Sequence, residues 1–566
     1  MHIKRIKKGD AVYLAQYESY RENGKVKTRF IKYLGKESEE KYVPLPKKSS
    51  HVETPLYPEC SKRAGDVKLM WAIAENELNM PSIIDRVCCG DGDIEGKSPG
   101  KILTSWAINK ALNPDSATNV GEWIQTTVLP SLIGLPEDYF TNGAFYTSLD
   151  RVCFKDNSAD GFTDFSQLIC EEIFSLWRKN HPLPENIEEV LAYDLTPILI
   201  FGDGDDLGEK GYNSKKENQK QINLCILVTK HDQIPVSFFL LPGNFNSMAS
   251  VKNLLVQLID MSINPGTLIW DRGNTSEESI RDIEKLGWKL ICGVQKVSEE
   301  AITLLRETEV PLSAKNRVKS TGNSALYASR AEGELFGKER AGVVYINMVK
   351  RMGLTDARNE LLGEIGECLD KLRENHNGLK KDEIESEFAK ITGEYSGFFI
   401  LNQRQMGSKI SFDWEFNEEN INVAASFDGK NLLYSTDTSV KVSEIVKEYV
   451  GKDFIEKSFK VLKSDLKLSP VRHWKKHRIR AIFFVNMMAL WIRKVYDGHL
   501  NKINEKDRKY SFEEFLRRLK RVEYIEIESV NGEKAFWYLN LTQIMVDQLK
   551  QMGFTNLFPE KRLNRL

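Results

Sequence analysis

The chain has 566 residues, of which 41% are hydrophobic and 28% are charged, and its formal net charge is −1. This length predicts roughly three or four domains, and the composition is typical of a soluble globular protein. Because the charges balance over the whole chain, any argument for a nucleic-acid partner has to rest on local charge patterns.

The cysteines and the apolar segments indicate the compartment. The eight cysteines form no CxxC or Cys/His pattern, which argues against a disulfide scaffold and against a structural zinc site. The basic N-terminus lacks the apolar core of a signal peptide. The most apolar run, residues 481–492, is too short to span a bilayer. We therefore expect a cytoplasmic protein without a membrane-spanning segment.

The first part of the chain divides into two regions. Residues 1–46 predict a β-hairpin segment, since two alternating stretches flank Asn23-Gly24, a strong hairpin signal. A polar, proline-bearing linker follows over residues 44–55. Helical periodicity then dominates residues 65–180, which predicts a helical domain.

The middle of the chain predicts an α/β core. In residues 188–294, three apolar strand-like runs are followed by alternating helices and strands, which is typical of a mixed sheet with helices on its faces. Residues 295–435 are less regular and predict a β-rich insertion around a charged helical stretch. We expect residues 436–500 to complete the core and residues 501–566 to form a helical C-terminal region.

Four short motifs imitate ligand sites. Gly90–Ser98 resembles a phosphate-binding loop, but its glycine spacing is one residue too long and no apolar strand precedes it. The acidic turns that begin at Asp91 and Asp203 lack the glutamate that closes a calcium loop. His473 and His477 lie four residues apart without a third zinc ligand nearby. We expect solvated turns and an exposed or DNA-facing histidine pair.

One glutamate stands among lysines on a predicted helix. If the segment is a single helix, four polar side chains form one narrow stripe beside an apolar stripe: Tyr449, Lys452, Glu456 and Lys463. An ordinary amphipathic surface helix with Glu–Lys pairs would show the same pattern. Gly451 also weakens the helix by roughly 1 kcal/mol relative to alanine.

Two aspartates lie in or at the end of apolar strands. Asp194 interrupts LAYDLTPILI, and Asp271 ends TLIWD. A carboxylate among apolar residues is costly to desolvate unless it is paired or binds a cation. Asp194 could pair with a buried arginine, and Asp271 could cap the helix that begins near Ser276. Cation binding is the functional alternative for both.

Asp194, Asp271 and Glu456 together make a sharper hypothesis. Three carboxylates, two from neighbouring strands and one from a helix, can hold two Mg²⁺ ions about 4 Å apart for phosphodiester chemistry. Hard oxygen ligands suit Mg²⁺, and Mn²⁺ is able to replace it at such a site.

A basic run follows Glu456 directly. Against one acid, Asp465, residues 457–480 carry nine lysines and arginines: Lys457, Lys460, Lys463, Lys467, Arg472, Lys475, Lys476, Arg478 and Arg480. Aromatic side chains are interspersed, which suits tracking of a nucleic-acid backbone with occasional stacking. A solvated charged face is the alternative, but such a local excess of cations favours a polyanionic partner.

At these residues the chain resembles the DDE transposases of prokaryotic insertion sequences, in the group whose third motif is written Y-(2)-R-(3)-E-(6)-K. Four residues reproduce the spacing of that motif: Tyr449, Lys452, Glu456 and Lys463. Lysine in place of the motif's arginine keeps the charge and loses the bidentate fork.

Other segments are similar to the same family. YDLT around Asp194 and WDRG around Asp271 match the places of the family's first two catalytic aspartates. Pro242–Asn244, which follows the third strand-like run, and the opening hairpin that ends in KYLGK are similar as well.

The resemblance implies a ribonuclease-H-like catalytic core in which three residues are catalytic and bind Mg²⁺: Asp194, Asp271 and Glu456. It implies that Tyr449, Lys452 and Lys463 contact DNA, and from the basic run we add Arg472, Lys475 and Lys476. It further implies that the N-terminal hairpin and residues 65–180 recognise DNA ends and that residues 295–435 are an insertion domain.

The partners implied by the resemblance are terminal inverted repeats and target DNA, with strand cleavage and transfer by a homodimer. Two alternatives stay open. One is a nuclease of the same fold that hydrolyses DNA without strand transfer, and the other is a catalytically silent DNA-binding derivative.

Overall fold

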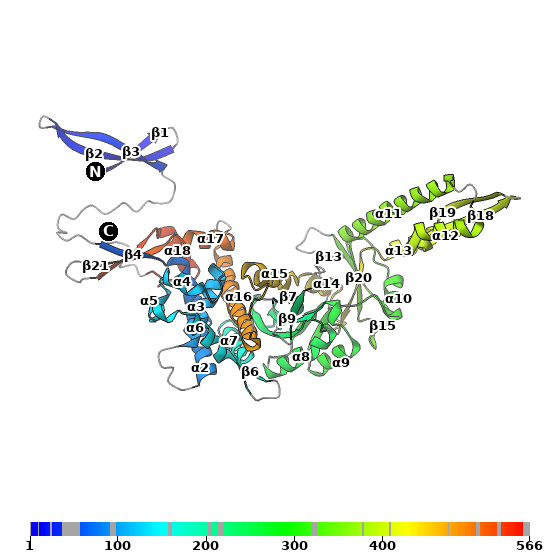
Figure 1. Cartoon of the computed structure of the whole chain (residues 1–566), viewed down its shortest axis with the longest axis horizontal. Helices are drawn as coiled ribbons and strands as arrows, with labels where there is room; N and C mark the ends of the chain where they lie inside the picture. Colours follow the sequence, from blue (N-terminus) through cyan, green and yellow to red (C-terminus); the bar gives the residue numbers. More distant parts are fainter. Residues whose placement is uncertain are drawn as a thin grey trace. The chain divides into compact units, whose positions relative to one another are not determined.

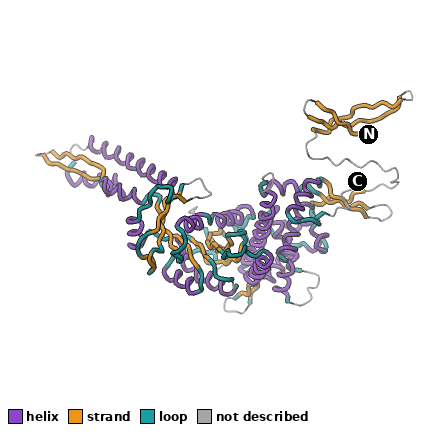
Figure 2. Tube along the Cα trace, turned by 180° about the vertical axis from the view of Figure 1, so that it is seen from behind, coloured by secondary structure: helices purple, strands orange, loops and turns teal. Residues whose placement is uncertain are grey.

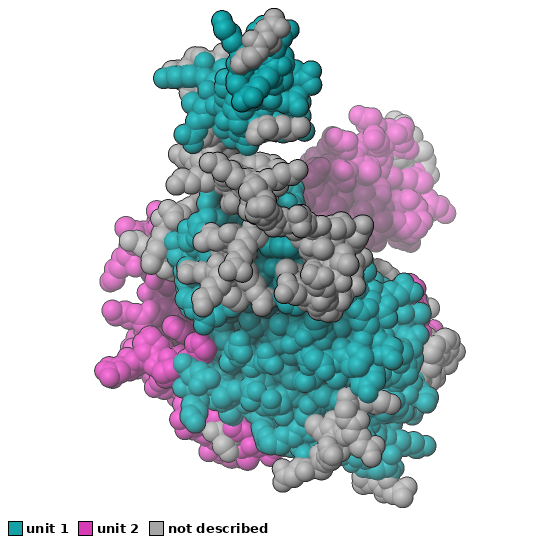
Figure 3. Space-filling view, turned by 90° about the vertical axis from the view of Figure 1, so that its left-hand side faces the viewer, with its two compact units in different colours: residues 1–180, 462–468, 473–566 teal, residues 181–461, 469–472 magenta. Residues whose placement is uncertain are grey.

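The computed structural model describes residues 2–8, 11–22, 25–36, 57–90, 98–156, 161–201, 207–211, 219–245, 247–261, 263–318, 325–375, 379–406, 409–473, 475–504, 510–528 and 534–558. The chain divides into two compact units (Figure 3). The first unit comprises residues 1–180, 462–468 and 473–566, and the second comprises residues 181–461 and 469–472.

The first unit begins with a three-stranded antiparallel sheet, shown in blue in Figure 1. Its order is β1 (His2–Lys8), β2 (Ala11–Glu22) and β3 (Lys25–Lys36). The sequence predicted only the hairpin of β2 and β3. Strand β1 was not predicted, because its charged sequence HIKRIKK shows little apolar alternation. The Asn23-Gly24 turn and the predicted linker lie outside the described residues.

Helices build most of the rest of the first unit. They are α1 (Gly65–Ala72), α2 (Met80–Cys89), α3 (Pro99–Leu112), α4 (Val120–Gln125), α5 (Leu129–Ile133), α6 (Asn142–Val152), α7 (Ser166–Asn180), α16 (Lys476–Asn504), α17 (Phe512–Leu519) and α18 (Gln543–Gln551), with a short hairpin of β5 (Cys153–Lys155) and β6 (Phe162–Asp164). α16 packs against α3 and α6, because residues 481–492 are apolar around the whole helix and are buried. Within the described ranges, no helix is long and apolar enough to cross a membrane.

The prediction of a helical C-terminal region is wrong in part. β21 (Glu523–Glu528) and β22 (Lys534–Leu539) form an antiparallel hairpin, and β21 also pairs with β4 (Tyr57–Arg63). The segment EYIEIE alternates with the period of a strand. Its partner β4 lies more than 450 residues earlier in the chain, so no local pattern identifies the pairing.

Within the described residues, a ten-stranded mixed sheet is the centre of the second unit, and its short strand β8 (Glu209–Lys210) pairs with β9 (Lys220–Thr229). One half of the sheet has the order β10-β9-β7-β11-β12, with β7 (Val190–Leu199), β9 (Lys220–Thr229), β10 (Pro235–Pro242), β11 (Thr267–Trp270) and β12 (Lys289–Gly293). β7, β9 and β10 are antiparallel neighbours, whereas β7, β11 and β12 run parallel. This is the ribonuclease-H-like arrangement, so the predicted fold class is confirmed.

Helices cover both faces of this sheet (Figure 1). The Tyr193 hydroxyl on β7 donates a hydrogen bond of 2.7 Å to Ser250, so α8 (Ser247–Asp260) covers the Tyr193 face. α9 (Glu277–Lys285) begins with the expected signal, since Ser276 caps it in a capping box with Ser279. The remaining helices of the unit's core are α14 (Val442–Val450) and α15 (Asp453–Lys460).

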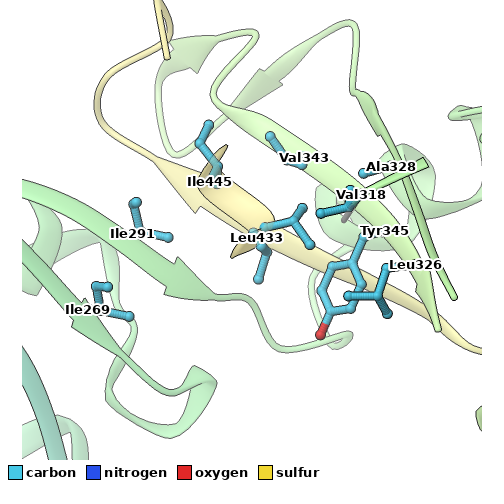
Figure 4. Close-up of a cluster of buried hydrophobic side chains, with 10 residues drawn as sticks. Ile269, Ile291, Val318, Leu326, Ala328, Val343, Tyr345, Leu433 and Ile445 are labelled. Carbon is cyan, nitrogen blue, oxygen red and sulfur yellow. The ribbon is translucent and has the colours of Figure 1, made fainter. Parts of the chain in front are cut away.

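The predicted insertion is partly continuous with the core. Its strands β20 (Lys430–Ser435), β17 (Gly342–Asn347), β14 (Leu326–Arg330) and β13 (Arg317–Val318) extend the central sheet beyond β12. Figure 4 shows how their side chains share one buried cluster with β11, β12 and α14. Ile269 and Ile291 from the core pack there with Leu433 and Tyr345 from the insertion.

The rest of the insertion is an arm, residues 348–426, with its own small core (Figure 2). It contains α11 (Met348–Asn375), α12 (Lys381–Thr392), β18 (Phe399–Met406), β19 (Lys409–Phe416) and α13 (Glu418–Ser426). Leu369, Phe388 and Phe399 are buried together in it. α10 (Glu299–Glu307) and the short strands β15 (Glu334–Leu335) and β16 (Lys338–Glu339) precede it. Helices occupy more of the insertion than strands do, which corrects the expectation of a β-rich domain.

Two arginine–aspartate pairs that involve helix α11 differ in exposure. Asp428 accepts bonds of 2.9 Å and 2.5 Å from Arg358 and one of 2.9 Å from Thr355, and the paired side chains are only 13% and 8% exposed. The pair Arg373–Asp413 is 43% and 70% exposed. The buried pair therefore holds the start of α11 against the turn before β20.

Asp428→Ala is expected to destabilise the arm by about 3–5 kcal/mol, because it leaves the Arg358 charge buried without its partner. Hydrogen–deuterium exchange of α11 should rise accordingly. The matched control is Asp413→Ala, which breaks an exposed pair and should cost less than about 1 kcal/mol. Equal exchange in the two variants would contradict the anchoring role of Asp428.

Candidate active site

Strand register places two of the predicted carboxylates side by side. β7 and β11 are parallel, and Tyr193 pairs with Trp270. The next residue of each segment is an aspartate, Asp194 on β7 and Asp271 directly after β11. Because side chains in one row of a sheet point to the same face and neighbouring strands lie about 5 Å apart, both carboxylates face the side opposite to Tyr193.

Gly293 continues the same row. Trp270 pairs with Cys292 on β12, so Gly293 lies across from Asp271. A Cβ atom at Gly293 would lie 2.5 Å from the Tyr449 hydroxyl and 3.1 Å from Arg272. The missing side chain therefore leaves space on this face of the sheet for the tyrosine.

Two side chains from the helical segment bind Asp271. The Tyr449 hydroxyl donates a hydrogen bond of 2.6 Å to Oδ1, and the Lys452 ammonium lies 2.7 Å from the same oxygen. The Lys452 Nζ atom also lies 4.5 Å from the centre of the Tyr449 ring. Tyr449, Lys452 and Asp271 thus form one compact group in which the lysine balances the carboxylate charge.

These contacts set the protonation of the group. Burial disfavours the charged carboxylate, but the Lys452 charge and the two hydrogen bonds outweigh it and hold the pKa of Asp271 below its usual value. Burial and the charge of Asp271 raise the pKa of Tyr449 far above its usual value. The tyrosine hydroxyl therefore stays protonated and acts as a donor.

Asp194 has a different electrostatic environment. Burial raises the pKa of its carboxyl to about 6. The Leu195 N–H and the Lys452 charge lower this pKa, while the Asp271 and Glu456 carboxylates raise it. The Asp271 and Glu456 carboxylates are therefore close enough to Asp194 to disfavour its ionised form.

Glu456 lies on a helix that the sequence pattern predicted only in part. The predicted single helix is interrupted: α14 ends at Val450, and α15 begins at Asp453. Gly451 lies in this break, in keeping with its low helix propensity. Glu456 is exposed on the first turn of α15, whereas Ile455 and Phe459 are buried, so the apolar stripe seats the helix as expected.

The structure does not support the two purely structural roles considered for the aspartates, a buried arginine partner for Asp194 and a helix cap for Asp271. Asp271 makes no side-chain cap hydrogen bond, and Ser276 caps α9 instead. The charged groups that act on Asp194 are Lys452, Asp271 and Glu456, and no arginine is among them.

Two consecutive buried hydrogen bonds behind Asp271, which we call the relay, were not predicted from the sequence. The Trp270 indole N–H donates to the Thr275 hydroxyl at 3.1 Å, and that hydroxyl donates to the Gly293 carbonyl at 2.8 Å. The relay ties the end of β11 to the end of β12 and so fixes the turn that carries Asp271. A glycine that ends a buried strand is the one sequence signal of close packing here.

The other basic residues predicted to bind DNA are divided between the two units. Arg472 belongs to the second unit, is exposed, and lies 5.5 Å from the centre of the Phe201 ring. Three others belong to the first unit: Lys463, Lys475 and Lys476. Lys475 directly precedes α16, and Lys476 is its first residue.

Two solved structures are similar to this chain at low TM-scores. One is a piggyBac transposase synaptic complex with hairpin DNA, with a TM-score of 0.35 and 10% identity over 83% of this chain and 82% of that one. The other is a Drosophila P element transposase strand transfer complex, with a TM-score of 0.21 and 12% identity over 88% of this chain and 99% of that one. A comparison with curated proteins finds no match.

Two protein-family models match this chain. A model described as IS1634 family transposase, N-terminal domain, matches residues 2–50. A model described as Transposase DDE domain matches residues 185–492, which is more than half of the chain and includes Asp194, Asp271 and Glu456. The resemblance noted in the sequence is therefore confirmed at the level of the family. The chain belongs to the DDE transposases of prokaryotic insertion sequences.

Proposed function

We propose that this transposase binds the ends of its insertion sequence as a homodimer in the cytoplasm. It then cuts the DNA and transfers the strands to a target with Asp194, Asp271 and Glu456 as metal ligands. The observation that carries the proposal is the row formed by β7 and β11, in which Asp194 and Asp271 lie side by side. Glu456 is close enough to raise the pKa of Asp194.

The donor set suits a hard divalent cation. Three carboxylates are the ligands that Mg²⁺ prefers, with Mn²⁺ as a substitute. Within the described residues, no group of three His, Cys, Asp or Glu side chains is already close enough to hold a metal ion. A positive charge nevertheless lies beside Asp271, since the Lys452 ammonium is in contact with its Oδ1 atom. This ion pair supports the proposal that these carboxylates attract a divalent cation, with the exposed Glu456 on α15 as the third ligand.

Mg²⁺ held by these carboxylates would activate a water or a 3′-hydroxyl and would stabilise the leaving oxygen of the phosphodiester. The chain's own residues orient the site. Tyr449 holds one oxygen of Asp271 in place, and the relay from Trp270 through Thr275 fixes the turn behind it. Lys452 balances the Asp271 charge, and we propose that it also contacts a DNA phosphate when DNA is bound.

Family membership favours strand transfer over the two alternatives, a hydrolytic nuclease and a silent DNA-binding derivative. The inverted repeats and the target DNA are the proposed partners. A pre-cut end supplied with a target duplex distinguishes the reactions, because a transposase joins the 3′ end to the target whereas a nuclease releases only shorter fragments.

Glu456→Gln is expected to reduce metal-dependent cleavage of a labelled element end by about a thousandfold or more, because a metal ligand contributes several kcal/mol to the transition state. Asp194→Asn and Asp271→Asn should behave alike. Binding of the end in EDTA should persist in all three variants, since each removes a negative charge.

The matched control for Glu456→Gln is Asp453→Asn, which removes an acid from the same helix. Asp453 is exposed and forms an ion pair of 2.7 Å with Lys457. This variant should cut at the wild-type rate. Cleavage by Glu456→Gln at the rate of the control, or cleavage by wild type in EDTA, would overturn the ligand assignment.

Gly293→Ala should displace the Tyr449 hydroxyl from Asp271, because the new Cβ would lie 2.5 Å from it. We expect cleavage to fall roughly tenfold or more, as a hydrogen bond to a charged group contributes about 1.5–3 kcal/mol. Tyr449→Phe removes the same bond and also makes room for the methyl group. The double variant should therefore lose less than the sum of the two single variants, in cleavage rate and in metal-free melting temperature, since only the 3.1 Å contact with Arg272 remains.

Additive effects of the two substitutions would contradict the steric link between Gly293 and Tyr449. If Tyr449→Phe changed only the affinity for the DNA end and left the catalytic rate constant unchanged, the tyrosine would have only the DNA-contacting role that the family resemblance implies.

A further inference from the structure

Lys452 is more enclosed than the lysine that follows it in the chain. Its side chain is only 12% exposed, whereas that of Lys457 on α15 is 68% exposed. Enclosing an ammonium group is costly unless an opposite charge pairs with it. Lys452 is also the N-cap residue of α15, so its side chain is able to move while its backbone stays at the start of the helix.

The ammonium and the Tyr449 hydroxyl share one oxygen atom of Asp271. Nζ lies 2.7 Å from Oδ1, and the hydroxyl donates to the same Oδ1 at 2.6 Å. A carboxylate oxygen has about two lone pairs, and these two donors use both. A divalent cation that binds Oδ1 must therefore displace one of them. Because like charges repel, the ammonium is the group that the cation drives away, whereas the neutral hydroxyl is not repelled.

The charge of Lys452 acts on both aspartates of the row. Burial acts to raise the pKa of Asp194 and of Asp271, and the Lys452 charge acts to lower both. A divalent cation shared by the two carboxylates has to act on both in the same way. Within the described parts of the chain, no three His, Cys, Asp or Glu side chains are already close enough to hold a metal ion, so the carboxylates have to draw together as they bind one. Their approach brings the cation to Asp271, where the ammonium now lies.

The lysine has a second favourable position within the site. Nζ lies 4.5 Å from the centre of the Tyr449 ring, a distance at which the ring face attracts a cation. The stem of a lysine is flexible, whereas a guanidinium binds a carboxylate through two parallel hydrogen bonds. The lysine that replaces the motif's arginine is therefore suited to leave Asp271 and to return.

We propose that the Lys452 ammonium and the divalent cation compete for Asp271, so that the lysine holds the carboxylate before the cation binds and is released when it binds. The released ammonium is then available for the DNA phosphate contact proposed above. This inference rests on the proposed function, because it takes Asp194 and Asp271 as metal ligands. It goes beyond that function in making the binding of the cation the event that frees the lysine.

The first test follows Lys452 in the wild-type chain and needs no substitution. Lysines of the full chain are acylated with an N-hydroxysuccinimide ester without DNA, with and without Mg²⁺, and the modified peptides are quantified by mass spectrometry. Modification of Lys452 should rise several-fold at saturating Mg²⁺, because Asp271 no longer holds the ammonium. Lys457 is the internal control, since it is already exposed and its partner Asp453 is not a proposed ligand. Unchanged or reduced modification of Lys452 would overturn the competition.

The second test measures the affinity of the full chain for Mn²⁺ without DNA, from the electron paramagnetic resonance signal of the free ion. Lys452→Met keeps a side chain of similar length and removes the competing charge, so the affinity should rise about tenfold. The matched control is Arg272→Met, which removes an exposed cation from the residue next to Asp271. Its affinity should rise much less. Equal gains in the two variants would show a general effect of charge and would overturn the competition.

Asp194→Asn separates this inference from the proposed function. If the affinity for Mn²⁺ does not change in Asp194→Asn, the ligand assignment fails and the competition fails with it. If Asp194→Asn weakens binding but Lys452→Met leaves the affinity at the wild-type value, the carboxylate site stands and only the competition is overturned. Weaker binding in Asp194→Asn together with tighter binding in Lys452→Met would support both.

Discussion

The parallel pairing of β7 with β11 is the constraint on which the site depends. It matches Tyr193 with Trp270 and thereby places the next residues, Asp194 and Asp271, in one row on one face of the sheet. Two carboxylates at this spacing repel each other, and burial raises the pKa of Asp194 to about 6. Such an arrangement is stable only with positive charge close by, and Lys452 supplies it at Asp271.

The insertion helps to position the site, because its strands share a hydrophobic core with the catalytic sheet. α14 is seated on a cluster that includes Ile269 from β11 and Leu433 from β20. The Tyr449 ring lies 6.5 Å from that of Tyr345, a residue of the insertion, and its hydroxyl reaches Asp271. Packing of the insertion strands therefore determines where the tyrosine stands, and the glycine at position 293 leaves it room.

Local patterns were sufficient for some of the fold and for part of the site. The order of strands and helices from β7 to β12 follows from apolar runs and turn signals, and the stripe of α15 follows from its period. The pairing of β21 with β4 could not be predicted, because β4 lies more than 450 residues earlier in the chain. The break at Gly451 was anticipated only as a weakness in the helix, because propensity alone does not decide where a helix ends.

The sequence by itself determined which residue types were available for chemistry: three carboxylates in unusual settings, a tyrosine and lysine at fixed spacing, and a basic run over residues 457–480. Tertiary structure alone decided that Tyr449 and Lys452 meet on one oxygen of Asp271 and that Gly293 stands across from it. The physical reason is that these contacts join four segments whose relative positions come from sheet register and core packing. Neither is encoded in the spacing of neighbouring residues.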